Sequence, residues 1–127
     1  MADAPRKAPD NPSLRIRILF GEDAMLGPGK ADLLERIGET GSIAAAGRAM
    51  SMSYKRAWML VMEMNAAFRD PLVESTRGGA RGGGARLTDA GSTVLAHYRK
   101  LEDITAKAGA ERIGAIQSML RNTPIGR

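Results

Sequence analysis

The chain has 127 residues, an apolar share of 43% and no cysteine. This length suits one small domain with an appended helix, and the apolar share is enough for a core. Without cysteine there is no disulfide framework and no thiolate metal site, and no apolar run approaches the length of a membrane-spanning helix. The N-terminus also lacks the apolar core of a secretory signal. We therefore expect a cytoplasmic protein with no membrane partner.

The charge balance favours a polyanionic partner. The 19 Lys and Arg residues outnumber the 14 Asp and Glu residues, which gives a formal net charge of +5. His97 is the only histidine, and the carboxylates are spread along the chain rather than gathered in a motif. We therefore expect no enzyme, no cofactor and no metal site, and we place His97 on a helix surface or at an interface.

The N-terminal part predicts a tail followed by a strand. Residues 1–13 mix Pro, Ala and charged residues without periodicity, which indicates a flexible tail. Apolar residues then alternate with Arg15 and Arg17, as in a half-buried strand that ends at Gly21. The residues that we expect to face inward are Leu14, Ile16, Ile18 and Phe20.

The next stretch predicts a helix from about residue 30 to 41. Leu33, Leu34 and Ile37 have helical spacing, and Gly41 suits the helix end. A Gly/Pro turn should precede this helix. Ser42 can then cap a short Ala-rich helix whose small residues would let another helix approach closely.

The stretch 43–60 has the spacing of a helix-turn-helix unit. The positions that such a unit turns inward all hold small or apolar residues. Ser51 stands at the turn, where Gly would most easily take a positive φ, so we expect a different backbone path there. The inward positions are Ala46, Met50, Met52, Ala57 and Leu60.

The second helix of this unit carries the candidate DNA-reading residues. Ser53 can cap it, and the first helical residues lie where free backbone N–H groups and the helix dipole favour phosphate. In the usual docking of such a unit, these residues reach base edges in the major groove. The alternative is a solvated basic helix face. The candidates are Ser53, Tyr54, Lys55, Arg56 and Met59.

Two neighbouring residues of this helix are not counted as candidates. We expect Trp58 to be partly buried against another helix, with a role facing DNA or a pocket as the alternative. We expect Glu63 to be structural or solvated rather than catalytic.

Residues 72–88 predict a β-hairpin with a long basic tip, in which LVESTR and ARLT form strands around the loop GGARGGG. Such a wing commonly contacts the DNA backbone or the minor groove, and Gly permits close approach to phosphate. A flexible hairpin without a ligand and an RGG-like RNA-binding segment are alternatives. A nucleotide-binding loop would need a Gly-Lys-Ser/Thr ending, which is absent. The basic candidates of the wing are Arg77, Arg81 and Arg86.

The C-terminal part predicts a long helix capped by Thr88 and a second helical segment after Gly109. Their apolar stripes are longer than a small winged domain can cover, so we expect residues 92–127 to form a helical dimerisation region. A cap over the core within one chain is the alternative. The stripe residues are Val94, Leu95, Tyr98, Leu101, Ile104 or Thr105, Ile113, Ile116 and Leu120.

Several of these residues together carry a family resemblance. The motifs are SYK at 53–55 with AW at 57–58, EMN at 63–65, LVE at 72–74, GGARGGGA at 78–85, and LT at 87–88 with Gly91. From about Leu14 to Leu101 the chain resembles the N-terminal DNA-binding domain of the molybdate-responsive regulator ModE, which is itself similar to the LysR-type winged helix.

The resemblance implies a dimeric winged helix-turn-helix repressor or activator of molybdenum uptake and molybdoenzyme genes, bound to a palindromic operator. It carries DNA contact over to Ser53, Tyr54 and Lys55 and to the wing from Arg77 to Arg86. Arg56 and Met59 differ from the family pattern, so we expect a different target sequence. Full-length members also carry C-terminal molybdate-binding domains. Because this chain ends at Arg127, we expect a domain that stands alone and do not count molybdate as its effector.

The expected fold is mainly α with a small β component, a winged helix-turn-helix with a C-terminal dimerisation helix. The expected divisions are a tail at 1–13, the DNA-binding domain at 14–91 and the dimerisation region at 92–127. The expected function is a homodimeric, sequence-specific transcription regulator that binds double-stranded DNA. The alternative is a protein-interaction module or anti-regulator that pairs with a full-length relative and has no operator of its own.

Overall fold

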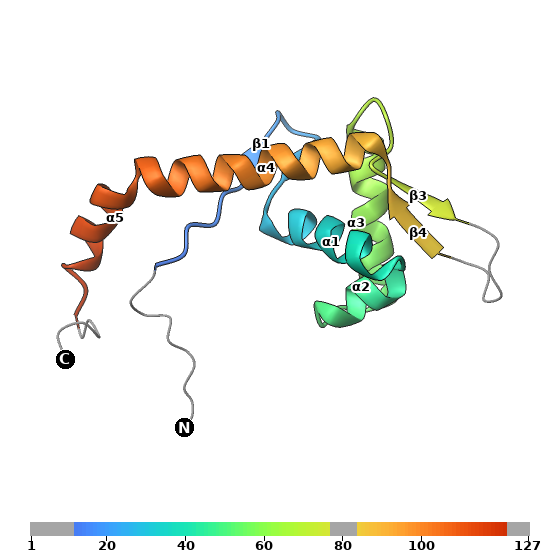
Figure 1. The fold of residues 1–127 in the computed structure, drawn as a ribbon, viewed down its shortest axis with the longest axis horizontal. Coiled ribbons are helices and arrows are strands. Elements are labelled where there is room, and N and C mark those ends of the chain that lie inside the picture. The colour runs from blue at the N-terminus through green and yellow to red at the C-terminus, as the bar shows by residue number, and fades with distance from the viewer. Residues whose placement is uncertain (1–11, 77–83, 122–127) are drawn as a thin grey trace, which may run out of the picture. The chain divides into compact units, whose positions relative to one another are not determined.

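The computed structural model describes residues 12–76 and 84–121, and its elements are mainly helical with a small β component, as predicted (Figure 1). The helices are α1 (Pro28–Thr40), α2 (Ile43–Ala49), α3 (Tyr54–Ala67), α4 (Asp89–Ala108) and α5 (Ala110–Gln117). The strands are β1 (Ile18–Leu19), β2 (Met25–Leu26), β3 (Val73–Thr76) and β4 (Gly84–Leu87). The chain divides into one compact unit at Ile16–Arg99 and a second made of residues up to Arg15 and from Lys100 onward.

The core of the Ile16–Arg99 unit lies between α1, α2, α3 and the β3–β4 hairpin, which gather together in Figure 1. The side chains of Leu33, Leu34 and Ile37 on α1 are fully buried, as their helical spacing predicts. The inward positions predicted for the helix-turn-helix unit all belong to this core, with Met50 and Met52 partly buried at its edge. The assignment of the inner face is therefore confirmed.

The helix α1 begins two residues before its predicted start. Gly27 is its N-cap and Pro28 occupies the first turn, where a missing backbone N–H costs nothing. The expected Gly/Pro turn is therefore the start of the helix itself. At the other end, Gly41 has φ 72° and its N–H donates to the carbonyl of Ile37, so it ends the helix as predicted.

The turn between α2 and α3 corrects one expectation. Ser51 adopts φ 59°, so the turn follows the left-handed path although the residue is not Gly. The N–H of Ser51 donates to the carbonyl of Arg48, and the N–H of Met52 donates to the carbonyl of Gly47, which hold this conformation. At Gly47 a Cβ would lie 3.1 Å from the Cβ of Ala57, so a small residue there brings α2 and α3 together.

The predicted hairpin is confirmed, and both of its strands are tied to the helices. β3 and β4 pair antiparallel, with Val73 opposite Leu87 and Thr76 opposite Gly84. The side-chain amide of Asn65 on α3 donates to the carbonyl of Val73, and its oxygen accepts from the N–H groups of Leu72 and Val73. The position of the hairpin base is therefore set by a side chain of α3.

The start of α4 is fixed by Thr88, as predicted. Its hydroxyl donates to the carbonyl of Pro71 at 2.7 Å and accepts from the N–H of Gly91 at 3.0 Å. Gly91 is buried, and a Cβ there would lie 2.1 Å from the carbonyl oxygen of Leu72. The chain before β3 therefore passes directly against the first turn of α4.

The N-terminal strand is shorter than predicted. β1 covers Ile18–Leu19 and pairs antiparallel with β2, whose existence was not predicted. Gly21 has φ 81°, and the chain turns back there. Phe20 is 51% exposed, although its N–H still donates to the carbonyl of Ala24, and Leu14 is 36% exposed. The predicted inward positions of both residues are wrong, because of the four predicted residues only Ile18 lies within the paired strand.

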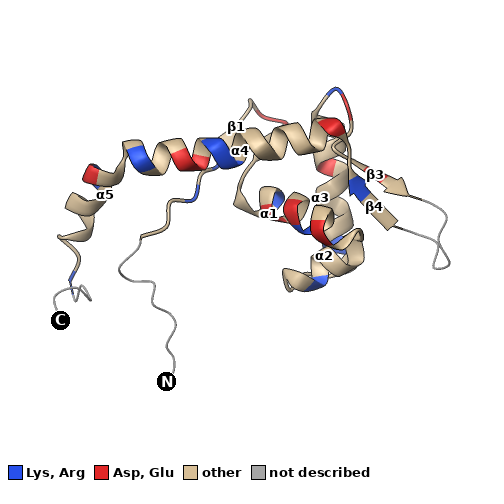
Figure 2. Cartoon of the chain, viewed as in Figure 1, with Lys and Arg blue, Asp and Glu red and all other residues tan. Residues whose placement is uncertain are grey.

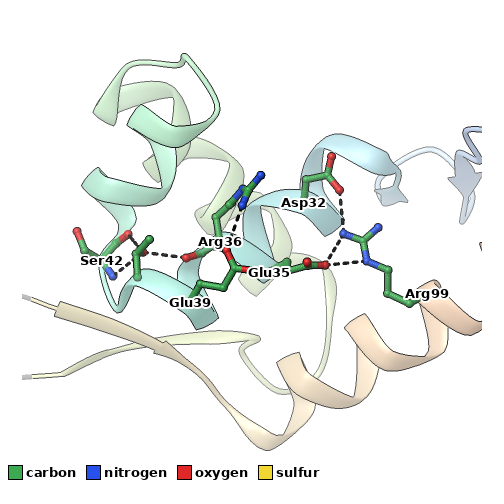
Figure 3. A network of polar contacts seen from close by, with 7 residues as sticks. Asp32, Glu35, Arg36, Glu39, Ser42 and Arg99 are labelled. Carbon is green, nitrogen blue, oxygen red and sulfur yellow. Dashed lines mark hydrogen bonds and ion pairs between the residues drawn. The ribbon is translucent and has the colours of Figure 1, made fainter. Parts of the chain in front are cut away.

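Two contacts of α4 close the unit on the side of α1. The hydroxyl of Tyr98, which is buried, donates to the carbonyl of Ile16. The guanidinium of Arg99 donates to Asp32 and to Glu35 on α1, each at 2.8 Å (Figure 3). The predicted helical stripe is thus packed as far as Tyr98.

The second unit contains the end of α4 and the whole of α5. Most of its large apolar side chains are exposed, Ile113 is half-buried, and α5 has no buried residue. The part of the chain that the structure describes holds no helix that is both long and apolar enough to cross a membrane. The exposed side chains are Leu101, Ile104, Ile116, Met119 and Leu120.

Candidate nucleic-acid interface

The start of α3 presents a polar and basic surface. The Ser53 hydroxyl accepts a hydrogen bond from the N–H of Arg56 at 3.0 Å, so Ser53 caps the helix as predicted. Its O–H proton remains available for donation to an acceptor such as a phosphate oxygen. Tyr54, Lys55 and Arg56 are all exposed in the first turn. A polyanion approaching this end of α3 would meet two cations and free backbone N–H groups.

The basic residues of this surface have no neutralising partners among the described residues. Between Gly41 and Met62 the only charged side chains are Arg48, Lys55 and Arg56. Each is exposed, and no ion pair in the described part of the chain involves any of them. The carboxylates lie outside this stretch, notably on α1, as Figure 2 shows, and at Glu63 further along α3. The helix-turn-helix unit therefore keeps its positive charge available to a partner.

Several cations elsewhere in the Ile16–Arg99 unit pair with carboxylates. Arg36 pairs with Glu39 at 3.1 Å (Figure 3), and Lys30, which is buried, pairs with Glu63 at 3.3 Å. This pairing confirms Glu63 as a structural residue. The contrast with Lys55 and Arg56 separates charges that hold the fold from charges that are free to bind.

The wing candidates lie on both sides of the described boundary. Arg77 and Arg81 lie outside the described residues. Arg86 is exposed on β4, and its Nε donates to Glu74 on the paired strand at 2.7 Å. Its charge is therefore shared with a carboxylate, unlike that of Lys55.

Met59 and Trp58 complete the exposed face of α3. Met59 is 41% exposed, one turn beyond Lys55. Trp58 is 43% exposed and lines a hollow of about 250 Å³ with residues of α2, of Tyr54 on its own helix and of the hairpin. The side chain of Trp58 is therefore partly covered by α2 and partly exposed to solvent.

Arg48 and the hollow beside Trp58 were not among the predicted site residues. Arg48 could have been found by its position in a stretch without carboxylates. The hollow could not, because it joins α2 and α3 to Ser75 and Gly84, whose proximity depends on the tertiary fold. The described residues contain no cluster of three or more His, Asp or Glu side chains that could hold a metal ion.

Comparison with known proteins agrees with this geometry. Residues 30–92 match the family described as bacterial regulatory helix-turn-helix protein, lysR family. These residues form a LysR-type helix-turn-helix domain. The match covers α1 from its third residue, α2, α3, both strands of the wing and the first residues of α4.

Curated relatives show which LysR-type domains are similar. The chain is 45% identical over 90 residues to the molybdenum-pterin-binding protein MopB of Rhodobacter capsulatus, covering 71% of this chain and 33% of that protein. It is 46% identical over 70 residues to the molybdenum transport protein ModE of Azotobacter vinelandii, covering 55% and 26%. It is 40% identical over 81 residues to the DNA-binding transcriptional dual regulator ModE of Escherichia coli strain K12, covering 64% and 31%.

The domain is therefore ModE-like, which confirms the resemblance, and none of these three relatives is described as an enzyme. The matched stretch spans about a third or less of the length of each of them.

Solved structures share the fold of the LysR-type domain. The DNA-binding domain of CbnR, solved as a complex with DNA, is 22% identical with a TM-score of 0.54, and the match covers 69% of this chain and 95% of that one. The full-length LTTR LysG from Corynebacterium glutamicum is 24% identical with a TM-score of 0.54, covering 74% and 30%. These likenesses confirm the winged helix-turn-helix architecture.

Proposed function

We propose that this protein is a transcription regulator that binds double-stranded DNA in a sequence-specific manner through the start of α3. The observation that carries the proposal is the unpaired positive charge of Arg48, Lys55 and Arg56 around a well-capped helix N-terminus. Ser53, Tyr54, Lys55, Arg56 and Met59 would face the major groove. The names of the relatives support a role in molybdenum-related gene control, and regulation of genes implies action in the cytoplasm.

We further propose that the protein acts as a homodimer through residues 92–127. The support is the set of apolar side chains that stay exposed on the end of α4 and on α5. Surfaces of this kind are usually covered by a partner, and a two-fold dimer would match a palindromic operator. The wing would add contacts to the DNA backbone from Arg77, Arg81 and Arg86.

The salt dependence of duplex binding tests the DNA-binding proposal. Anisotropy of a labelled duplex of mixed sequence is measured against protein concentration at several salt concentrations. Lys55→Ala should lower the slope of log affinity against log salt by about one, because one phosphate contact is lost. Arg36→Ala is the matched control, since it removes one charge that is already paired on α1 and should leave the slope unchanged. Absence of duplex binding by the unmodified protein at low salt would overturn the proposal and favour the protein-interaction module.

Sequence selection tests the specificity and the role of molybdate together. Duplexes bound by the protein are recovered from a random pool, with and without molybdate, and sequenced. We expect two related half-sites about one helical turn apart, as for a two-fold dimer. A difference between the two pools would assign molybdate as an effector of this chain.

A further inference from the structure

Trp58 occupies a place that neither the fold nor direct base reading explains. Its indole is 43% exposed in a protein whose other large core side chains, such as Leu33 and Met64, are almost fully buried. The indole forms one wall of the 250 Å³ hollow described above, between α2, α3 and the β3–β4 hairpin. An exposed tryptophan at an open hollow is common where a partner covers the ring. The residues around the hollow are Ser42, Ile43, Ala44, Tyr54, Ser75 and Gly84.

The geometry of α3 separates Trp58 from Lys55 and Met59, two of the residues proposed to read bases, and places it on the same flank as Tyr54. Successive residues turn by about 100° around a helix axis, so Met59 lies roughly 40° from Lys55, and Trp58 lies roughly 60° from Lys55 in the opposite sense. Lys55 and Met59 thus point away from the buried side of α3, whereas Trp58 and Tyr54 lie on the flank next to the hairpin. If a duplex is bound by the face of α3 that carries Lys55 and Met59, the part of the duplex that contacts Trp58 differs from the part that contacts Lys55 and Met59.

The chemistry of the hollow indicates which part of the duplex this is. Among the described residues, its walls are two aromatic rings, the apolar side chains of Ile43 and Ala44 and two serine hydroxyls, and none of these residues is charged. A phosphate would find no cation among them. The bases of an intact duplex remain stacked in its interior and show only their edges in the grooves, while the uncharged sugars are accessible along each strand between the charged phosphates.

We propose that the Trp58 indole packs against a deoxyribose of the DNA strand that passes between α3 and the β3–β4 hairpin. This inference rests on the proposed DNA-binding function. The neighbouring phosphates would then lie outside the hollow and would pair with the exposed cations at the start of α3. Such a contact positions the strand and adds affinity without selecting a base.

The emission of Trp58 gives a direct test, because the protein contains one tryptophan. Unlabelled duplex of mixed sequence is added to the unmodified protein at low salt, and indole emission is recorded beside the anisotropy of a labelled duplex of the same kind. The emission should change and saturate at the same duplex concentration as the anisotropy. Binding by anisotropy with unchanged emission would overturn the inference and leave the proposed function intact. Absence of binding in both measurements would overturn both.

Two variants separate a sugar contact from base reading. Trp58→Ala should weaken binding roughly tenfold, because the apolar area that the indole covers is lost, and it should do so equally for every sequence and without changing the salt slope. Trp58→Phe keeps a ring and should recover most of the lost affinity. A change of base preference at one position would show base reading and overturn the inference.

Thermal unfolding of the same variants checks that the domain stays folded. We expect the midpoint of Trp58→Phe to match that of the unmodified protein. If Trp58→Phe is folded but binds as weakly as Trp58→Ala, ring packing on the sugar is contradicted. The emission measurement on the unmodified protein decides the question independently of how Trp58→Ala folds.

Discussion

At Gly91 the fold has room for a hydrogen atom, but not for a Cβ, at the side-chain position of the Cα. A Cβ there would lie 2.1 Å from the carbonyl oxygen of Leu72, a backbone atom that cannot move aside as a flexible side chain could. The surrounding chain is also held by the hydroxyl of Thr88, which bonds to Pro71 and to Gly91 itself. Close backbone approach therefore accounts for glycine at this position.

We predict that Gly91→Ala lowers the free energy of unfolding by about 1–3 kcal/mol, as overpacking typically does. Gly38→Ala is the matched control, because Gly38 lies on an exposed part of α1 and a Cβ there would meet only the side chain of Leu87 at an ordinary 3.5 Å. That control should raise stability by up to about 1 kcal/mol, since Ala favours a helix more than Gly does. Urea unfolding monitored by circular dichroism measures both. Equal effects of the two substitutions would contradict the close-approach argument.

Predictions for single residues succeeded where the local pattern decides the outcome. Ser42, Ser53 and Thr88 cap helices as their residue types predict, because capping needs only the residues next in the chain. Ser51 shows the limit of such rules. Its positive φ is held by the hydrogen bond from its own N–H to Arg48, by the bond from the N–H of Met52 to Gly47, and by the packing of the flanking methionines. Residue preference alone does not reveal these contacts.

At the scale of elements, one side chain joins the recognition helix to the wing. Asn65 uses both ends of its amide on the chain at Leu72 and Val73, so α3 and β3 are connected by three hydrogen bonds. The side chains of Leu72 and Val73 are buried, so water cannot easily replace the amide there. The wing base is therefore positioned by the same helix that carries the proposed reading residues.

We predict that Asn65→Leu costs about 2–4 kcal/mol of unfolding free energy, because two buried backbone N–H groups lose their acceptor. Asn65→Asp keeps the acceptor oxygens for these N–H groups and loses only the donation to Val73, so its cost should be smaller. Chemical denaturation of both variants gives the comparison. A loss for Asn65→Asp as large as that for Asn65→Leu would contradict the assigned hydrogen bonds.

Most elements were predictable because each has its own periodicity. The inner faces of α1 and of the helix-turn-helix unit follow helical spacing, and the hairpin follows its alternation and glycines. The strand β2, and with it the pairing to β1, was missed because β2 has two residues, too few to show a period. The apolar alternation through Phe20 overstated β1, since pairing stops where the chain turns at Gly21.

For the molecule as a whole, the apolar residues that remain exposed outside the packed unit indicate where a second molecule could bind. The apolar stripe of α4 is covered at Tyr98 but exposed at Leu101 and Ile104, where it enters the second unit. Isolated apolar side chains on a surface are ordinary, but a succession of them along adjoining helices favours association. This is the surface on which the dimer proposal depends.

We predict that Ile104→Glu lowers the apparent mass in analytical ultracentrifugation from that of a dimer to that of a monomer, because a charge would have to be buried at the interface. Lys107→Glu is the control. It changes an exposed residue on the same helix that pairs with Asp103, so the dimer should persist. A monomeric unmodified protein, or a dimer unaffected by Ile104→Glu, would contradict the assignment of this interface.

Sequence reasoning reached the class of the whole molecule, since spacing and motifs indicated a winged helix-turn-helix. It did not reach the arrangement of charge. Lys30, Arg86 and Arg99 look as available as Lys55 in the sequence, yet the fold pairs each of them with a carboxylate. Which cations remain unpaired depends on contacts between residues far apart in the chain.

The bond between the N–H of Ala85 and the carbonyl of Gly41 has a consequence for how the domain comes apart. It links β4 to the end of α1, and Ala85 is buried in the same core cluster as Ala46 and Ala57. Exchange of that amide proton with solvent therefore requires the wing to detach from the helices. The free energy of opening measured by exchange of this amide should equal the free energy of global unfolding. The wing and the helix-turn-helix unit would then unfold together as one cooperative unit.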